Sequence, residues 1–155
     1  MKTILISLLV LLSTTTTTYS QWVVKSVNNG LDEPYTISYC PSIEKSQAIA
    51  KLERVGEQVA FYVIGSYFCE ESPIVDIALI VNGESVKYQI IGTKSSDNTT
   101  VFLIDDLTIE DSKDFLDNFK KASKLIIRVN EDYCQDDIYT FNMSGSTKAY
   151  YTMSK

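Results

Sequence analysis

Apolar side chains recur at helical spacing in one stretch of the chain. This apolar face consists of Phe115, Leu116, Phe119 and Ala122. Thr108 is a favourable N-cap residue, and Asp111 occupies the capping-box position three residues later. Lys120 and Lys121 fall in the last turn, where the helix dipole favours positive charge. The pattern therefore predicts a helix over residues 109–122 whose apolar face covers a sheet.

The rest of the chain is dominated by alternating apolar and polar positions and by short apolar runs, which are typical of β-strands. Residues 76–91 carry the strongest hairpin signal, because Asn82 and Gly83 separate two apolar runs and both accept the positive φ of a type I′ turn. Residues 59–68 are rich in β-branched and aromatic side chains and predict a central strand. Further strands are predicted over residues 22–27, 35–40, 99–104, 124–130 and 138–143.

The segment before Gly56 allows two interpretations. Its Ala, Glu, Lys, Gln and Leu residues favour a helix that Gly56 would end. However, Ala48, Ala50 and Leu52 alternate with charged neighbours, and Gly56 would equally suit a hairpin turn. We interpret residues 47–54 as a strand.

These elements together predict a mainly β domain of the α+β class. It would be an antiparallel, sandwich-like sheet of about eight strands with one crossing helix. Residues 147–153 would add a short helix at the C-terminus.

The first twenty residues have the features of a secretory signal peptide. Lys2 supplies a positive start, residues 4–12 form an apolar run, and residues 18–20 place small side chains at a cleavage site. The apolar run is too short to span a bilayer, although an uncleaved N-terminal anchor is the alternative. We expect a signal peptide over residues 1–20, a single domain over residues 21–155, and a secreted or periplasmic location.

Charge narrows the choice of partners. Lys2 leaves with the leader, so 13 basic residues remain against 20 acidic ones, a net charge of −7. An acidic surface argues against nucleic acids and anionic membranes as partners. No second apolar run is long enough for a transmembrane helix, so we expect no stable membrane insertion after cleavage.

Export makes disulfides possible, and the three cysteines allow at most one pair within the chain. Cys69 and Cys134 have similar surroundings, each at the end of a predicted strand. They are therefore the favoured pair, which leaves Cys40 as the free thiol. Cys40–Cys69 is the second choice, and three reduced thiols, two of them buried, are the remaining alternative.

The chain contains no histidine, which removes the commonest general base and the commonest metal ligand. The sequence also lacks a Walker loop, a G-x-S-x-G elbow, a G-x-G-x-x-G turn and paired zinc-ligand cysteines. Loop carboxylates remain as alternatives for a hydrolase or for calcium, although loop acids are usually just solvated. These acids are Glu70, Glu71, Asp105, Asp106, Glu131, Asp132, Asp136 and Asp137. We expect no catalytic residue, cofactor or metal.

Two other features are compatible with a surface role. The tyrosines lie mostly in predicted strands, where half-buried positions explain them, but tyrosine is also enriched at recognition surfaces. Asn98 and Asn142 each begin an N-glycosylation sequon, and Asn142 lies inside a predicted strand, where it is a poor acceptor.

Several segments resemble small exported bacterial domains. Trp22-Val23-Val24 resembles their opening, residues 63–69 resemble a strand ending in cysteine, and residues 115–129 resemble their helix and following strand. Residues 141–149, FNMSGSTKA, are similar to their closing segment. The families are the VasI-type accessory proteins of type VI secretion and the invasion-associated locus B proteins. The resemblance implies an exported β-rich accessory or interaction domain, and it carries over no catalytic residue.

We therefore predict an exported, non-enzymatic accessory or interaction domain that binds another protein or a component of the cell envelope. One alternative is an inhibitor of a hydrolase, and another is a hydrolase that depends on paired carboxylates.

Overall fold

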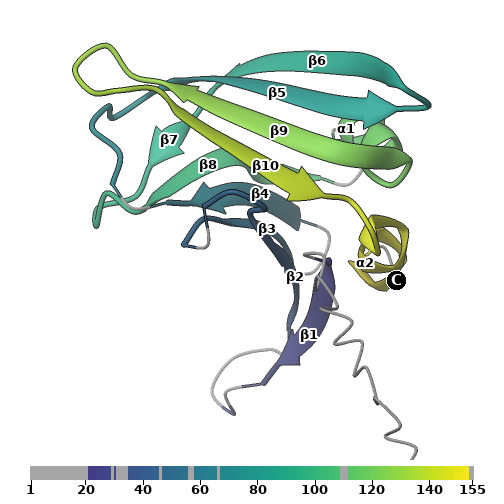
Figure 1. The fold of residues 1–155 in the computed structure, drawn as a ribbon. Coiled ribbons are helices and arrows are strands. Elements are labelled where there is room, and N and C mark those ends of the chain that lie inside the picture. The colour runs from purple at the N-terminus through teal and green to yellow at the C-terminus, as the bar shows by residue number, and fades with distance from the viewer. Residues whose placement is uncertain are drawn as a thin grey trace, which may run out of the picture.

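The computed structural model describes residues 21–28, 30, 35–45, 47–55, 58–65, 67–108 and 112–153. The expected signal peptide, residues 1–20, lies outside this part of the chain. The described residues form two antiparallel sheets with a shared core and two helices at one end (Figure 1). The predicted α+β, mainly β, sandwich-like fold is confirmed. The described ranges contain ten strands, where the sequence predicted about eight.

The larger sheet has six strands, and its order follows the chain except at one end. In spatial order they are β1 (Val23–Val27), β2 (Tyr35–Pro41), β3 (Ile49–Val55), β4 (Gln58–Ile64), β8 (Thr100–Thr108) and β7 (Thr93–Lys94). The strand interpretation of residues 47–54 is confirmed by β3, which pairs with both β2 and β4. β4 is central, as predicted, but it ends at Ile64 rather than at residue 68.

The chain leaves the six-stranded sheet at Gly65, where there is no room for a side chain. A Cβ atom at residue 65 would come within 2.5 Å of the Tyr139 hydroxyl and 2.8 Å of the Phe68 ring. Beyond this point the backbone bonds to a loop instead of a strand, since Phe68 N–H donates to Asn98 O.

The smaller sheet has four strands and contains the predicted hairpin. Their spatial order is β10 (Asp137–Asn142), β9 (Ala122–Asn130), β5 (Ile74–Val81) and β6 (Glu84–Ile91). β5 and β6 pair from Val81 and Glu84 outward, so the turn consists of two residues. Asn82 has φ 53° and Gly83 has φ 86°, as a type I′ turn requires.

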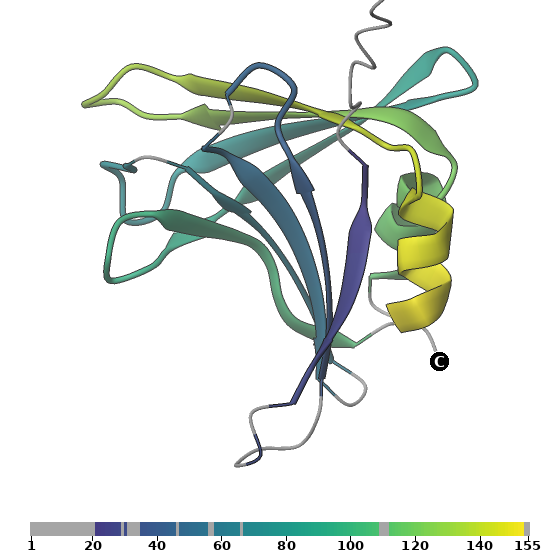
Figure 2. The ribbon, with the colours of Figure 1, turned by 60° about the horizontal axis from the view of Figure 1, so that its bottom comes forward.

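The two helices, α1 (Lys113–Phe119) and α2 (Ser146–Met153), lie at the same end of the molecule (Figure 2). The C-terminal helix was predicted from the sequence, and α2 confirms it. Among the described residues there is no helix with the length and apolarity needed to cross a membrane.

The predicted bounds of the first helix, residues 109–122, are wrong at both ends. Thr108 is not an N-cap, because it ends β8 and pairs with Gln58 of β4. Ser112 is the N-cap instead, without a side-chain capping bond, and Ala122 already begins β9. Strand pairing therefore overrides the local capping pattern at both ends. Residues 109–111, including the predicted capping-box Asp111, lie outside the described residues.

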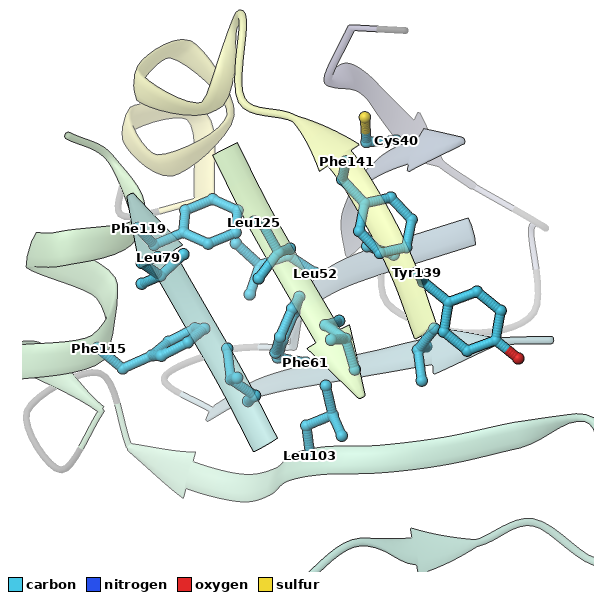
Figure 3. Packing of buried hydrophobic residues seen from close by; sticks show 14 of the residues in the cluster. Cys40, Leu52, Phe61, Leu79, Leu103, Phe115, Phe119, Leu125, Tyr139 and Phe141 are labelled. Atoms are coloured by element: carbon cyan, nitrogen blue, oxygen red, sulfur yellow. The ribbon is translucent and has the colours of Figure 1, made fainter. Parts of the chain in front are cut away.

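The core lies between the sheets, and aromatic rings of α1 fill its helical end (Figure 3). Phe115 and Phe119 pack against Phe61 of β4, with ring centroids 5.2 and 6.0 Å apart. Trp22 meets Phe119 edge-on at 4.8 Å, and its indole N–H donates to Met143 Sδ at 3.2 Å. The apolar stripe that predicted the helix thus forms part of the core.

Candidate functional site

The structure brings Cys69 and Cys134 together as a disulfide with a Cα–Cα distance of 6.3 Å. This is the pair that the sequence favoured, and it joins the connection after β4 to the turn between β9 and β10. Cys40 stands outside the disulfide and is buried in β2. Its Sγ donates to the carbonyl of Asn142 at 3.4 Å, so this thiol belongs to the packing of β2 against β10.

A buried carboxylate lies beside the disulfide. Glu131 is 6% exposed, and its Oε1 accepts the N–H groups of Cys69 at 2.7 Å and Glu70 at 3.3 Å. Glu131, Cys69 and Cys134 are the one group of three potential metal ligands among the described residues. With both sulfurs joined to each other, no thiolate is left to bind a metal. The arrangement therefore holds two chain segments together.

Most of the other predicted acidic candidates that the structure describes have structural partners or are exposed. Glu70 is half-buried, and its Oε1 is buried without a hydrogen-bond partner in the described part of the chain. Asp136 accepts a hydrogen bond from the N–H of Glu131 at 3.2 Å. Asp137 accepts one from the Tyr139 hydroxyl at 2.9 Å and forms an ion pair with Lys45. Glu71 is exposed and forms an ion pair with the largely buried Lys94, and Asp132 is exposed. The side chains of residues 105 and 106 lie outside the described part. These contacts do not bring the described acids together around a common cleft.

The two sequon asparagines differ in their surroundings. Asn98 lies in the loop before β8 with φ 59°, and its backbone carbonyl accepts Phe68 N–H. Asn142 ends β10, and its side-chain oxygen accepts the N–H of Ser144 at 2.8 Å. Asn142 is half-buried at the end of the strand, and its side chain is engaged with the backbone that follows.

The outer face of the six-stranded sheet carries side chains of a different kind. Its strands place buried residues such as Cys40, Leu52 and Phe61 toward the core, so their sequence neighbours point outward. The strand registers align these neighbours in one row across the whole sheet. We call it the aromatic row, and it consists of Val23, Tyr39, Lys51, Tyr62, Phe102 and Thr93.

Tyr62 is the centre of the aromatic row. Its ring lies 5.3 Å from that of Phe102, and Lys51 Nζ lies 5.0 Å above it. Its hydroxyl donates to Glu53 Oε2 at 2.6 Å, and the same oxygen lies 3.1 Å from Lys51 Nζ. Burial and this hydrogen bond raise the pKa of Tyr62 well above its ordinary value. Tyr62 therefore stays neutral and is fixed in place although it points away from the core.

A shallow hollow lies beside Tyr62 on the same face, with a volume of about 500 Å³. Apolar side chains such as Ile64 and Phe102 form much of its lining, and Glu53 and Gln58 supply polar groups. The paired residues Ile49 and Ile64 extend the apolar surface toward β3. These side chains are half-buried in the chain alone, so a partner has apolar area left to cover.

The four-stranded sheet has a second hollow, of about 530 Å³, on its own outer face. Lys87 and Arg128 line it together with Asp76, Gln89 and Ile126. Asp76 accepts bonds from Gln89 at 2.8 Å and from Asn130 at 3.1 Å. These bonds and the nearby cations lower the pKa of Asp76, so its carboxylate is charged at neutral pH. Asp76 is thus held by two neutral amides, with Lys87 and Arg128 near it.

Sequence reasoning found the tyrosines but missed the aromatic row. Tyr39 and Tyr62 lie on separate strands and become neighbours only through their common partner Lys51. Alternation in each strand gave the face of each side chain, but the register that aligns them is set by non-local pairing.

Comparison with models of protein families, with curated proteins and with solved structures finds no match for this chain. The resemblance to VasI-type and invasion-associated locus B proteins therefore stays a prediction.

Proposed function

We propose that this chain is an exported, non-enzymatic interaction domain that binds another protein on the outer face of its six-stranded sheet. The observation that carries the proposal is the aromatic row, with Tyr39, Tyr62 and Phe102 in register on the sheet surface. A contiguous surface that combines aromatic and aliphatic side chains with a few polar groups is typical of protein interfaces.

The energetics of the aromatic row favour binding. Tyr62 is already held by Glu53 and Lys51, so a partner would not have to order its side chain. Tyr62 itself is 8% exposed, so the aromatic area open to a partner comes mainly from the half-buried Tyr39 and Phe102. Aromatic rings that bring large area at low entropic cost are enriched among residues whose truncation weakens complexes most.

The charges on this face also indicate what kind of surface the partner has. Lys51 and Glu53 neutralise each other at the centre of the row. The fitting partner is therefore a protein surface that is mainly apolar and offers no concentrated charge to the centre. A strongly anionic polymer is disfavoured by the acidic chain as a whole.

The proposal is tested by replacing Tyr39 or Phe102 with the photo-crosslinking residue benzoylphenylalanine. The protein is then irradiated with the envelope and culture-medium proteins of its source cells. We expect one defined covalent adduct from both positions, since both lie in the aromatic row. Tyr39→Ala should weaken binding of the captured protein by at least about tenfold.

Tyr133 provides the matched control, because it is 88% exposed and lies outside the row, beside the disulfide. The probe at residue 133 should give no adduct, and Tyr133→Ala should leave the affinity unchanged. Equal adducts from all three positions, or none at saturating concentration, would refute this assignment.

A further inference from the structure

The four-stranded sheet has a long margin that no described element covers, and this margin is β6 (Figure 1). The other sheet margins among the described residues are short or covered. β1 has five residues and β7 has two. β10 is covered at Thr140, because Ile43 N–H and the Ser42 hydroxyl both donate to Thr140 O, at 2.8 and 3.1 Å. β6 has eight residues, and no described segment covers its outer margin in this way.

The free hydrogen-bonding groups of β6 can be assigned residue by residue. The two-residue turn makes Val81 and Glu84 a hydrogen-bonded pair, and bonding alternates from there. Gly92 N–H donates to Pro73 O at 2.9 Å, which confirms that even-numbered residues face β5. The N–H and C=O groups that point away from the sheet therefore belong to Ser85, Lys87, Gln89 and Ile91. Such a row is a template for another strand.

We propose that a second copy of this chain pairs with it, β6 against β6 in antiparallel orientation, around a two-fold axis at Tyr88. In this register Ser85 pairs with Ile91 of the second copy, and Lys87 pairs with Gln89. All four outward-facing positions on each strand then find partners. The two neighbouring registers pair only three positions, and one of them sets Lys87 directly against the same lysine of the second copy.

The side chains also fit this register. On the inner face Val86 meets Ile90 and Tyr88 meets Tyr88, and all three are half-buried in one copy alone. Tyr88 already packs against Phe115 of the core at 5.5 Å, so the new contacts extend an existing apolar layer. The pairing also sets Ile91, 75% exposed, beside Ser85 of the second copy.

Charge complementarity on the outer face favours a second copy over an unrelated strand. Asp76 lies one strand inward from Gln89 and holds it by a hydrogen bond of 2.8 Å. Lys87 of the second copy lies one strand beyond Gln89, about 10 Å from Asp76 between backbones and within the combined reach of the two side chains. The two-fold axis creates this ion pair twice. An eight-stranded sheet across two copies is the result.

The test uses the mature protein produced from the full chain. Its molar mass is measured by light scattering over a concentration series. We expect a concentration-dependent dimer. Amide exchange should show the N–H groups of Ser85, Lys87, Gln89 and Ile91 gaining protection as the dimer forms. A monomer at every concentration, or a dimer in which these four amides stay unprotected, overturns the proposal.

Lys87→Pro removes an N–H that faces away from β5, so the fold should survive while the dimer loses two hydrogen bonds. We expect its dissociation constant to rise at least about tenfold. Lys87→Thr keeps the N–H and tests the charge alone, and its effect should be smaller.

Ile138→Pro is the matched edge substitution on β10, where even-numbered residues also face away from the neighbouring strand, and it should leave the dimer intact. Equal weakening by both prolines would overturn the β6 assignment. If Lys87→Pro does not fold, the amide protection pattern of the unaltered protein decides. A dimer that persists after Tyr39→Ala separates this pairing from the binding surface proposed above.

Discussion

At the scale of single residues, polar groups in this protein mostly serve to fix backbone and ring positions. Glu131 binds two backbone N–H groups beside the disulfide, and Glu53 binds the Tyr62 hydroxyl. The sequence marked Glu131 only as one of several loop acids. Its role could not be predicted, because its bonding partners Cys69 and Glu70 lie about sixty residues earlier in the chain.

The raised pKa of the Tyr62 hydroxyl predicts how the free energy of unfolding changes at alkaline pH. Its pKa is raised in the fold by burial and by Glu53, whereas in the unfolded chain the phenol titrates near pH 10. The unfolded state therefore loses this proton first, and the contribution of Tyr62 is present below about pH 10 and is lost as pH rises above it. Tyr62→Phe should make the free energy of unfolding fall less steeply between about pH 10 and 11.

Urea denaturation at several pH values measures this slope. Tyr67→Phe is the control, because its side chain is 57% exposed and lies outside the core. An unchanged slope in Tyr62→Phe would show that folding does not raise the pKa of this hydroxyl.

At the scale of elements, local signals predicted the turns and strands better than the helix. The hairpin of β5 and β6 follows from Asn82 and Gly83 alone, since few other residue pairs accept its backbone angles. The first helix was placed seven residues too long, because Thr108 and Ala122 have partners in neighbouring strands. Those partners come from β4 and β5, which the local sequence around the helix does not reveal.

The hairpin turn gives a prediction at this scale. Gly83→Ala should lower the free energy of unfolding by about 1–2 kcal/mol, because φ of 86° is costly for a residue with a Cβ atom. No side chain crowds the site, so the cost is conformational rather than steric contact with neighbours. Glu84→Ala, one residue later in an exposed strand position, should stay within about 0.5 kcal/mol of the parent. Equal urea midpoints for the two variants would contradict this explanation.

At the scale of the whole molecule, the two sheets are connected at both ends. The helices lie at one end, and the turn between β9 and β10, which carries Cys134, lies at the other (Figure 1). The sequence predicted the sheet class and the favoured cysteine pair, but not the division into sheets of six and four strands. That division depends on which strands become neighbours, such as β9 beside β5, and no local pattern specifies this.

The disulfide should therefore contribute strongly to global stability. It closes a loop with a sequence separation of 65, and in the chain-entropy model this is worth about 4 kcal/mol. Replacing both Cys69 and Cys134 by alanine should lower the free energy of unfolding by that order. Calorimetry on the oxidised parent and the double variant measures the difference. A loss below about 1 kcal/mol would mean that the unfolded chain is already restricted without the bond.

The only tryptophan of the sequence, Trp22, lies two residues beyond the expected leader and inside the core. Cleavage of the predicted signal peptide would therefore have to be accurate almost to the residue. A peptidase that cut two bonds too late would remove the indole and leave Phe119 facing a void, at a cost of about 3–5 kcal/mol. Such a product would also lack indole fluorescence, so the emission spectrum alone would reveal incorrect maturation.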